Sequence, residues 1–123
     1  MRCIAVDDEP LALKVISDYV KKVPFLELIG TFDNPFDGLQ LINHEAIDIA
    51  FLDINMPIMD GFEFLEAATE EFKDGFTEIV VAMLTTSLNP VDKERARKFD
   101  VVREYITKPL TKQHIQDVVA FLS

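Results

Sequence analysis

Residues 48–61 read Asp-Ile-Ala-Phe-Leu-Asp-Ile-Asn-Met-Pro-Ile-Met-Asp-Gly, and this stretch decides the fold. Residues 49–52 form a short apolar run between two aspartates, which is typical of a strand buried on both faces. Asp53 stands where this strand ends, and Met56 precedes a proline and therefore avoids helical geometry. The sequence thus predicts a carboxylate at the carboxyl end of a buried strand, where ligands bind in open α/β sheets. Taken alone, Asp53 could equally cap a simple turn.

Length and charge limit the classes of protein to which the chain can belong. With 123 residues and 49% hydrophobic residues, we expect one domain, residues 1–123, with a real core. The net charge of −10 disfavours direct binding of nucleic acid by this domain. Cys3 is the only cysteine, so no intramolecular disulfide can form. With neither a membrane-length apolar stretch nor a signal peptide, we expect a cytoplasmic protein without a membrane partner.

Outside the central stretch, apolar runs alternate with helical patterns along the whole chain. Besides residues 49–52, strands are predicted at 3–6, 26–32, 79–84 and 102–106. Helices are predicted from Pro10, from Pro35, after Asp60-Gly61, over 91–98 and after Thr111. Five strand–helix units in succession predict an α/β fold with one doubly wound parallel sheet. Five strands suit the flavodoxin-like strand order 2-1-3-4-5.

Polar residues follow the predicted strands at the points where they end. Asp7 and Asp8 follow the first strand, Asp53 the third, Thr85 the fourth and Lys108 the fifth. In a parallel sheet these ends share one edge, where three carboxylates repel one another unless a cation joins them. Mg²⁺ is the natural cation because it takes oxygen ligands and often shares carboxylates with a phosphate. Together with a lysine and a hydroxyl, this set predicts phosphoryl transfer to a carboxylate, with Asp53 as the nucleophile.

Each of these residues also has a plain structural explanation. The Asp7-Asp8 pair could complement a helix dipole, and Thr85 and Thr86 could be ordinary polar residues at a strand end. A lone lysine such as Lys108 is more often a solvated surface residue, and Tyr105 could simply pack. Their joint placement at strand ends, in chain order, favours a functional site.

These motifs together resemble a response regulator receiver domain over essentially the whole chain. The similarity is carried by Asp7-Asp8-Glu9-Pro10, by residues 52–61, by Leu84-Thr85, and by Tyr105 with Lys108-Pro109. The resemblance implies that Asp53 is the phospho-acceptor and that Lys108 pairs with the phosphoryl group. It also implies that Mg²⁺ is bound by the side chains of Asp8 and Asp53, by the backbone carbonyl of Asn55, and by Asp7 through water. Thr85 and Tyr105 would form a switch pair, and Lys108-Pro109 would be a cis bond.

Two features depart from the family pattern. Residues 98–104 contain no glycine where such receivers often carry Gly-Ala and a second glycine. The spacing from Thr85 to Lys108 is one residue longer than expected, so either Thr85 or Thr86 could be the switch hydroxyl. Thr85 is favoured because it stands at the strand end.

Several functions remain open at this level. A signalling switch would take its phosphoryl group from a histidine kinase or phosphotransfer protein, and would catalyse its own phosphorylation and slow hydrolysis without being a conventional enzyme. A phosphatase would place a second aspartate two residues after the nucleophile, where Asn55 stands. An unphosphorylated interaction module is disfavoured by the intact acidic pair and Lys108.

The output is open as well. The first thirteen residues resemble receivers that precede a LytTR-type DNA-binding domain, although the chain ends at Ser123. We expect the face formed by helix 91–98, strand 102–106 and the last helix to bind an effector or a second copy in a homodimer.

Overall fold

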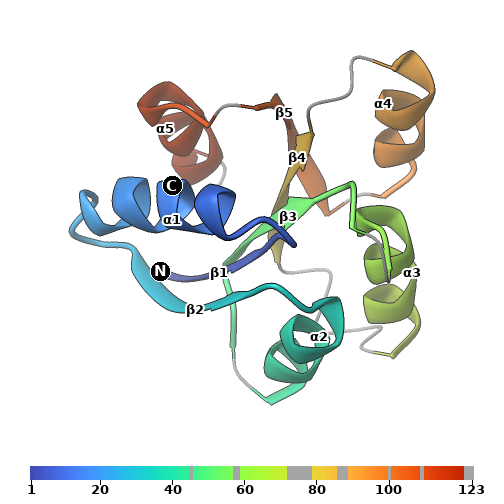
Figure 1. Cartoon of the computed structure of the whole chain (residues 1–123), viewed down its shortest axis with the longest axis horizontal. Helices are drawn as coiled ribbons and strands as arrows, with labels where there is room; N and C mark the ends of the chain where they lie inside the picture. Colours follow the sequence, from blue (N-terminus) through green and yellow to red (C-terminus); the bar gives the residue numbers. More distant parts are fainter. Residues whose placement is uncertain are drawn as a thin grey trace.

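A five-stranded parallel sheet forms the centre of the molecule, with strand order β2-β1-β3-β4-β5 (Figure 1). This order confirms the predicted flavodoxin-like α/β fold. The computed structural model describes residues 1–44, 46–56, 59–71, 79–85, 89–99, 101–108 and 110–120. The strands are β1 (Arg2–Val6), β2 (Glu27–Phe32), β3 (Ile49–Asp53), β4 (Val80–Thr85) and β5 (Val102–Thr107). Asp53 and Thr85 are therefore the last residues of their strands, one position further than the apolar runs predicted.

Helices cover both faces of the sheet. The described helices are α1 (Pro10–Lys21), α2 (Pro35–His44), α3 (Gly61–Glu71), α4 (Pro90–Arg97) and α5 (Lys112–Ala120). Helices α1 and α5 lie on one side, and α2, α3 and α4 lie on the other (Figure 1). No helix in the part of the chain that the structure describes is both long enough and apolar enough to cross a membrane.

Successive side chains along each strand point to opposite faces of the sheet, and this divides the core into two clusters. Ile4 and Val6 of β1 pack with α2 and α3, whereas Cys3 and Ala5 of the same strand pack with α1 and α5. β3 and β4 alternate in the same way, and every residue of both strands is buried. Burial on both faces is the expected consequence of helices on both sides of a parallel sheet. It explains why these two strands are nearly continuous apolar runs in the sequence.

Side-chain caps fix the points where helices begin. Asp60 and Glu63 form a reciprocal capping box, in which the Glu63 N–H donates to Asp60 Oδ1 at 2.8 Å and the Asp60 N–H donates to Glu63 Oε1 at 3.2 Å. Asn89 accepts a hydrogen bond from the Val91 N–H at 3.0 Å. The cap at Asp60 matters for function because it starts α3 shortly after the loop that follows Asp53.

The pairing of β4 with β5 contains a β-bulge. Val81 pairs with Val102, but its neighbour Ala82 pairs with Glu104, so Arg103 is the extra residue. Beyond the bulge the register is regular, and Thr85 lies opposite Thr107. The Lys108 N–H then donates to the Thr85 carbonyl at 2.7 Å. Thr85 is therefore the last residue of β4 and is tied through its carbonyl to the residue that follows β5.

Candidate functional site

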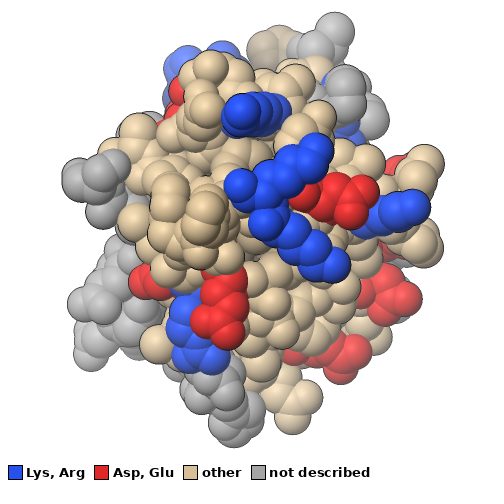
Figure 2. All heavy atoms as spheres, turned by 90° about the vertical axis from the view of Figure 1, so that its left-hand side faces the viewer, with Lys and Arg blue, Asp and Glu red and all other residues tan. Residues whose placement is uncertain are grey.

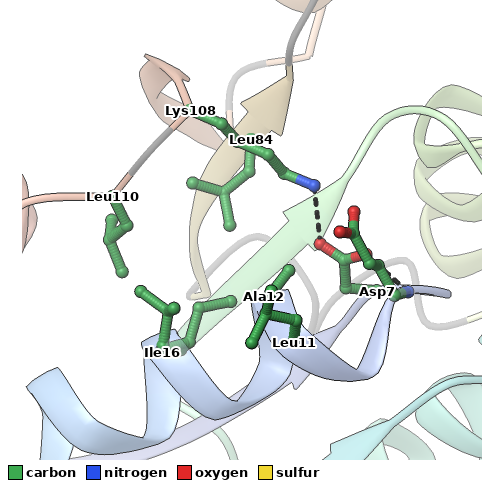
Figure 3. Close-up of a pocket in the computed structure, with 9 residues that line it drawn as sticks. Asp7, Leu11, Ala12, Ile16, Leu84, Lys108 and Leu110 are labelled. Atoms are coloured by element: carbon green, nitrogen blue, oxygen red, sulfur yellow. Dashed lines mark hydrogen bonds and ion pairs between the residues drawn. The ribbon is translucent and has the colours of Figure 1, made fainter.

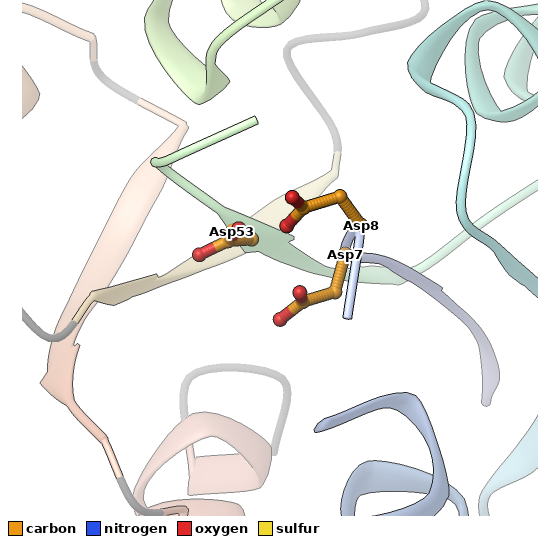
Figure 4. A group of neighbouring side chains, drawn as sticks. All are labelled: Asp7, Asp8 and Asp53. Atoms are coloured by element: carbon orange, nitrogen blue, oxygen red, sulfur yellow. The ribbon is translucent and has the colours of Figure 1, made fainter. Parts of the chain in front are cut away.

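The predicted site residues meet at the carboxyl edge of the sheet. Asp7 and Asp8 follow β1, Asp53 ends β3, Thr85 ends β4 and Lys108 follows β5. Figure 4 shows the carboxylates of Asp7, Asp8 and Asp53 converging at the ends of their strands. Asp7, Asp53 and Thr85 are almost completely buried, with exposed fractions of 0%, 2% and 0%, whereas Asp8 is exposed. The structure therefore brings together residues that are up to 101 positions apart in the chain.

The three carboxylates have the geometry of a cation site. One oxygen from each of Asp7, Asp8 and Asp53 lies within 4.8 Å of the other two. Burial, together with the negative charge of Asp7, raises the pKa of Asp53 to about 6. The raised pKa means that the positive charge nearby in the protein does not fully offset the cost of ionising Asp53. An all-oxygen donor set that is partly open to solvent fits Mg²⁺, which retains several of its own waters.

Lys108 supplies the positive charge at the site. Its Nζ atom lies 2.8 Å from Asp7 Oδ2 and 3.2 Å from Asp53 Oδ1, and 17% of its side chain is exposed. Burial alone would lower the pKa of Lys108, but the contacts with Asp7 and Asp53 outweigh it and raise this pKa. Lys108 therefore remains a cation and bridges the two buried carboxylates.

Asp7 is held from two directions. Its Oδ2 atom accepts from Lys108, and its Oδ1 atom accepts from the Glu9 N–H at 2.9 Å. These contacts fix the orientation of a fully buried carboxylate and, through it, the position of Lys108. The sequence predicted a water-mediated metal ligand at Asp7, which stays a prediction. The ion pair with Lys108 is a positioning role that the spacing of the residues did not reveal.

A solvent-accessible hollow of about 350 Å³ opens over the acceptor residue. It is lined by Asp8, Glu9, Pro10, Asp53, Asn55 and Lys108. Asn55 is exposed on the loop that follows β3, two residues from Asp53. A small anionic group placed here would meet the Lys108 ammonium and the Asp53 carboxylate together.

Thr85 and Tyr105 lie on neighbouring strands behind the acceptor. Tyr105 pairs with Met83 of β4, and its hydroxyl oxygen is buried without a hydrogen-bond partner among the residues that the structure describes. Burial raises the pKa of Tyr105, the charge of Asp92 raises it further, and Thr85 opposes the rise. The Tyr105 hydroxyl is therefore already turned into the protein, in the neighbourhood of Thr85.

Some predicted features lie outside the described residues. These are Thr86, the alternative switch hydroxyl, Pro57 and Ile58 of the central motif, and Pro109 with the predicted cis bond. They stay predictions.

Gly61 is a site residue whose role was not recognised from the sequence. A Cβ atom at this position would lie 2.7 Å from the Asp53 carbonyl oxygen and 2.9 Å from Met83 Cε. The Gly61 N–H also donates to the Ile54 carbonyl at 2.9 Å, which ties the start of α3 to the residue after Asp53. Glycine is required for this close approach, and the Asp-Gly pair was the only signal of it.

Comparison with known proteins identifies the family that shares this arrangement. Residues 3–120 match the family model described as the response regulator receiver domain. Transcriptional regulatory protein YpdB from Escherichia coli K12 is 31% identical over 115 residues, which is 94% of this chain and 44% of that protein. The chain therefore spans less than half the length of this relative.

Solved structures show the same fold. A two component response regulator from Cytophaga hutchinsonii has a TM-score of 0.90 at 22% identity, covering 98% of this chain and 95% of the other. The response regulatory domain of protein mrkE from Klebsiella pneumoniae has a TM-score of 0.81 at 27% identity, covering 99% and 94%.

Proposed function

The chain belongs to the response regulator receiver domains of two-component systems, and from this premise we propose that Asp53 accepts a phosphoryl group in a Mg²⁺-dependent reaction. Receiver domains interact with histidine kinases, phosphotransfer proteins and effectors, and in general they are not conventional enzymes. The observation that carries the proposal is the Lys108 ammonium, which lies between Asp7 and Asp53 beside three converging carboxylates. The proposed donor is a histidine kinase or phosphotransfer protein, and the reaction would take place in the cytoplasm.

The site residues divide the chemistry among them. Asp53 attacks the phosphorus atom, so the bond from phosphorus to the donor histidine nitrogen breaks as the bond to an Asp53 oxygen forms. With a pKa of about 6, Asp53 is largely ionised at neutral pH and can act as the nucleophile. Lys108, 3.2 Å from Asp53 Oδ1, stabilises negative charge on the transferred oxygens.

Mg²⁺ would be held by the side chains of Asp8 and Asp53, by the backbone carbonyl of Asn55 and, through water, by Asp7. It would supply positive charge that offsets the negative charge of the carboxylates and of the phosphoryl oxygens. Asn55 stands where an aspartyl-phosphate phosphatase would carry its second aspartate. This supports a phosphorylated state that hydrolyses slowly, as a signalling switch requires.

Signal transmission is proposed to run through Thr85 and Tyr105. A phosphoryl group on Asp53 adds negative charge and acceptor oxygens next to the end of β4. Thr85 would turn toward these oxygens, and the buried orientation of Tyr105 would become more populated. Because the Tyr105 hydroxyl is buried in the structure already, phosphorylation would shift a population between existing states. The surface that reports this shift would be that of α4, β5 and α5.

The charges of α4 and β5 suit docking to a partner. Lys93, Ala96 and Arg97 of α4 line a hollow of about 310 Å³ with four residues of β5, among them Arg103 and Tyr105. The effector or second copy that the sequence predicted would bind here through paired charges.

A second candidate function concerns the whole protein to which such a chain could belong. The E. coli relative is named a transcriptional regulatory protein, and this chain matches 44% of its length. This favours, as an alternative, the receiver half of a longer transcriptional regulator. That its DNA-binding domain would be of the LytTR type rests on the resemblance of the first thirteen residues alone.

Phosphorylation by acetyl phosphate tests the proposed function. Intact-protein mass spectrometry should show one phosphoryl group on the wild type in the presence of Mg²⁺, and none after chelation. Asp53→Asn should remain unmodified under the same conditions. A phosphoryl group retained by Asp53→Asn would place the acceptor elsewhere.

A further inference from the structure

An apolar groove lies beside the acceptor hollow, between α1 on one side and Leu84, Lys108 and Leu110 on the other (Figure 3). It has a volume of about 320 Å³ and is open to solvent. Its apolar lining consists of Leu11, Ala12, Val15, Ile16, Leu84 and Leu110. Leu11 at its rim is 66% exposed. Nothing in phosphoryl transfer from acetyl phosphate requires an apolar cavity of this size.

The groove adjoins the hollow over the acceptor. Glu9 and Lys108 line both the groove and the hollow over Asp53. Figure 3 shows the Lys108 ammonium bonded to Asp7 at the polar end of the groove, with Leu84 and Leu110 along its wall. A donor whose phosphoryl group meets Asp53 and Lys108 can therefore place the adjoining part of its structure in the groove.

Positive and negative side chains both occur on this side of the molecule. Although the net charge is −10, lysine and arginine side chains gather on the side that carries α1 and α5 (Figure 2). The exposed lysines of these helices include Lys14, Lys21 and Lys112. At the groove itself, the Lys108 ammonium is the positive group that an anionic ligand would meet, beside the carboxylates of Asp7 and Glu9.

We propose that this groove binds the acyl chain of a small acyl phosphate longer than acetyl phosphate, and so selects short, unbranched acyl phosphates as direct phosphodonors. The inference rests on the proposed phosphorylation of Asp53. In the reaction, the bond between phosphorus and the acyl oxygen breaks, the bond between phosphorus and an Asp53 oxygen forms, and a free carboxylate leaves. No oxidant or further reactant is needed.

The rate of phosphorylation should depend on the length of the acyl chain. Burying one more methylene group of a ligand increases its binding affinity about fourfold. The kcat/KM for labelling of Asp53, measured by mass spectrometry with Mg²⁺, should therefore rise roughly fourfold per carbon from acetyl to propionyl to butyryl phosphate. Equal rates, or rates that fall with chain length, would overturn the inference.

A variant that fills the groove locates the effect. Ala12→Leu adds a bulky apolar side chain to the lining, so the ratio of the butyryl to the acetyl rate should fall toward one. Ala46→Leu is the matched control, because Ala46 is exposed just before β3 begins, at the opposite edge of the sheet from the site. It should keep the wild-type ratio. A ratio that stays high in Ala12→Leu would place the acyl chain outside the groove.

An equilibrium measurement gives a second readout without phosphoryl transfer. Butylphosphonate should shift the NMR signals of the methyl groups of Ala12, Val15 and Leu110 and bind more tightly than methylphosphonate, again roughly fourfold per methylene. Absence of these shifts would contradict the groove assignment.

If acetyl phosphate too fails to label Asp53, the proposed function itself fails. If acetyl phosphate labels Asp53 and chain length has no effect, only this inference fails.

Discussion

Asp53 is a buried carboxylate whose surroundings act on its charge in opposite directions. Burial and the neighbouring Asp7 disfavour its ionised form, whereas Lys108 at 3.2 Å favours it, and the net result is a pKa of about 6. The raised pKa shows that ionised Asp53 destabilises the metal-free protein. Binding of a cation would remove this cost, so the arrangement that destabilises the metal-free protein also favours binding of Mg²⁺.

The first prediction follows from this pKa. Between the ordinary value of 3.8 and about 6, the folded state binds more protons than the unfolded state, so stability falls as pH rises through this window. Asp53→Asn removes the ionised group and should raise the free energy of unfolding at pH 7 without Mg²⁺ by roughly 1–2 kcal/mol. The gain should vanish near pH 4. Urea unfolding at both pH values measures it, and an Asn variant that is less stable than the wild type at pH 7 would refute this reading of Asp53.

The second prediction concerns Asp8, the exposed member of the acidic group. Mg²⁺ should raise the melting temperature of the wild type, because a ligand that binds only the folded state stabilises it. Asp8→Ala should lose most of this shift while keeping the fold, with a small rise in metal-free stability as like charges separate. Asp18→Ala, an exposed acid on α1, is the matched control. Equal shifts in the wild type and Asp8→Ala would exclude Asp8 as a ligand.

The sequence predicted which residues form the site but not how they contact one another. Chain order and strand ends were enough to bring Asp53, Asp7 and Lys108 to one edge. The closer pairing of Lys108 with Asp7 than with Asp53 depends on side-chain packing, which periodicity does not contain. The burial of the Tyr105 hydroxyl could not be predicted either, because it depends on how β5 lies against its neighbours.

Among the structural elements, the start of α3 is the one most tightly coupled to the acceptor. A third prediction is that Gly61→Ala destabilises the protein by about 1–3 kcal/mol, because its Cβ would meet the Asp53 carbonyl oxygen, which is backbone and cannot turn away. Gly38→Ala in α2 is the comparison. Its Cβ would meet a side-chain atom, Val6 Cγ2, at 2.8 Å, and alanine favours the helix interior by about 1 kcal/mol. Chemical unfolding of both variants checks this; a smaller loss at Gly61 than at Gly38 would be inconsistent with it.

Most elements could be predicted because their apolar patterns are strong. β3 and β4 are buried on both faces and read as continuous apolar runs, and Asn89 and the Asp60–Glu63 pair marked helix starts that the structure confirms. The bulge at Arg103 could not be predicted, since an extra residue in an edge strand leaves no periodic signal.

At the scale of the whole molecule, the acceptor edge and the proposed output face are joined through β4 and β5. Thr85 ends β4 beside Asp53, and Tyr105 lies one strand away, on the strand that lines the hollow beneath α4. Phosphorylation at one edge can therefore alter a surface built from different elements, provided that both states of Thr85 and Tyr105 are accessible. This coupling is the central claim of the account, because an acceptor that did not alter a surface would not signal.

The most direct test of this claim is NMR spectroscopy with beryllofluoride, a phosphoryl mimic, and Mg²⁺. The account predicts that backbone amide shifts in the wild type extend from the residues around Asp53 to Thr85, Tyr105, α4 and β5. In Thr85→Ala they should remain near Asp53, and in Asp53→Asn they should be absent. Shifts confined to the loops around Asp53 in the wild type, or an unchanged pattern in Thr85→Ala, would contradict it.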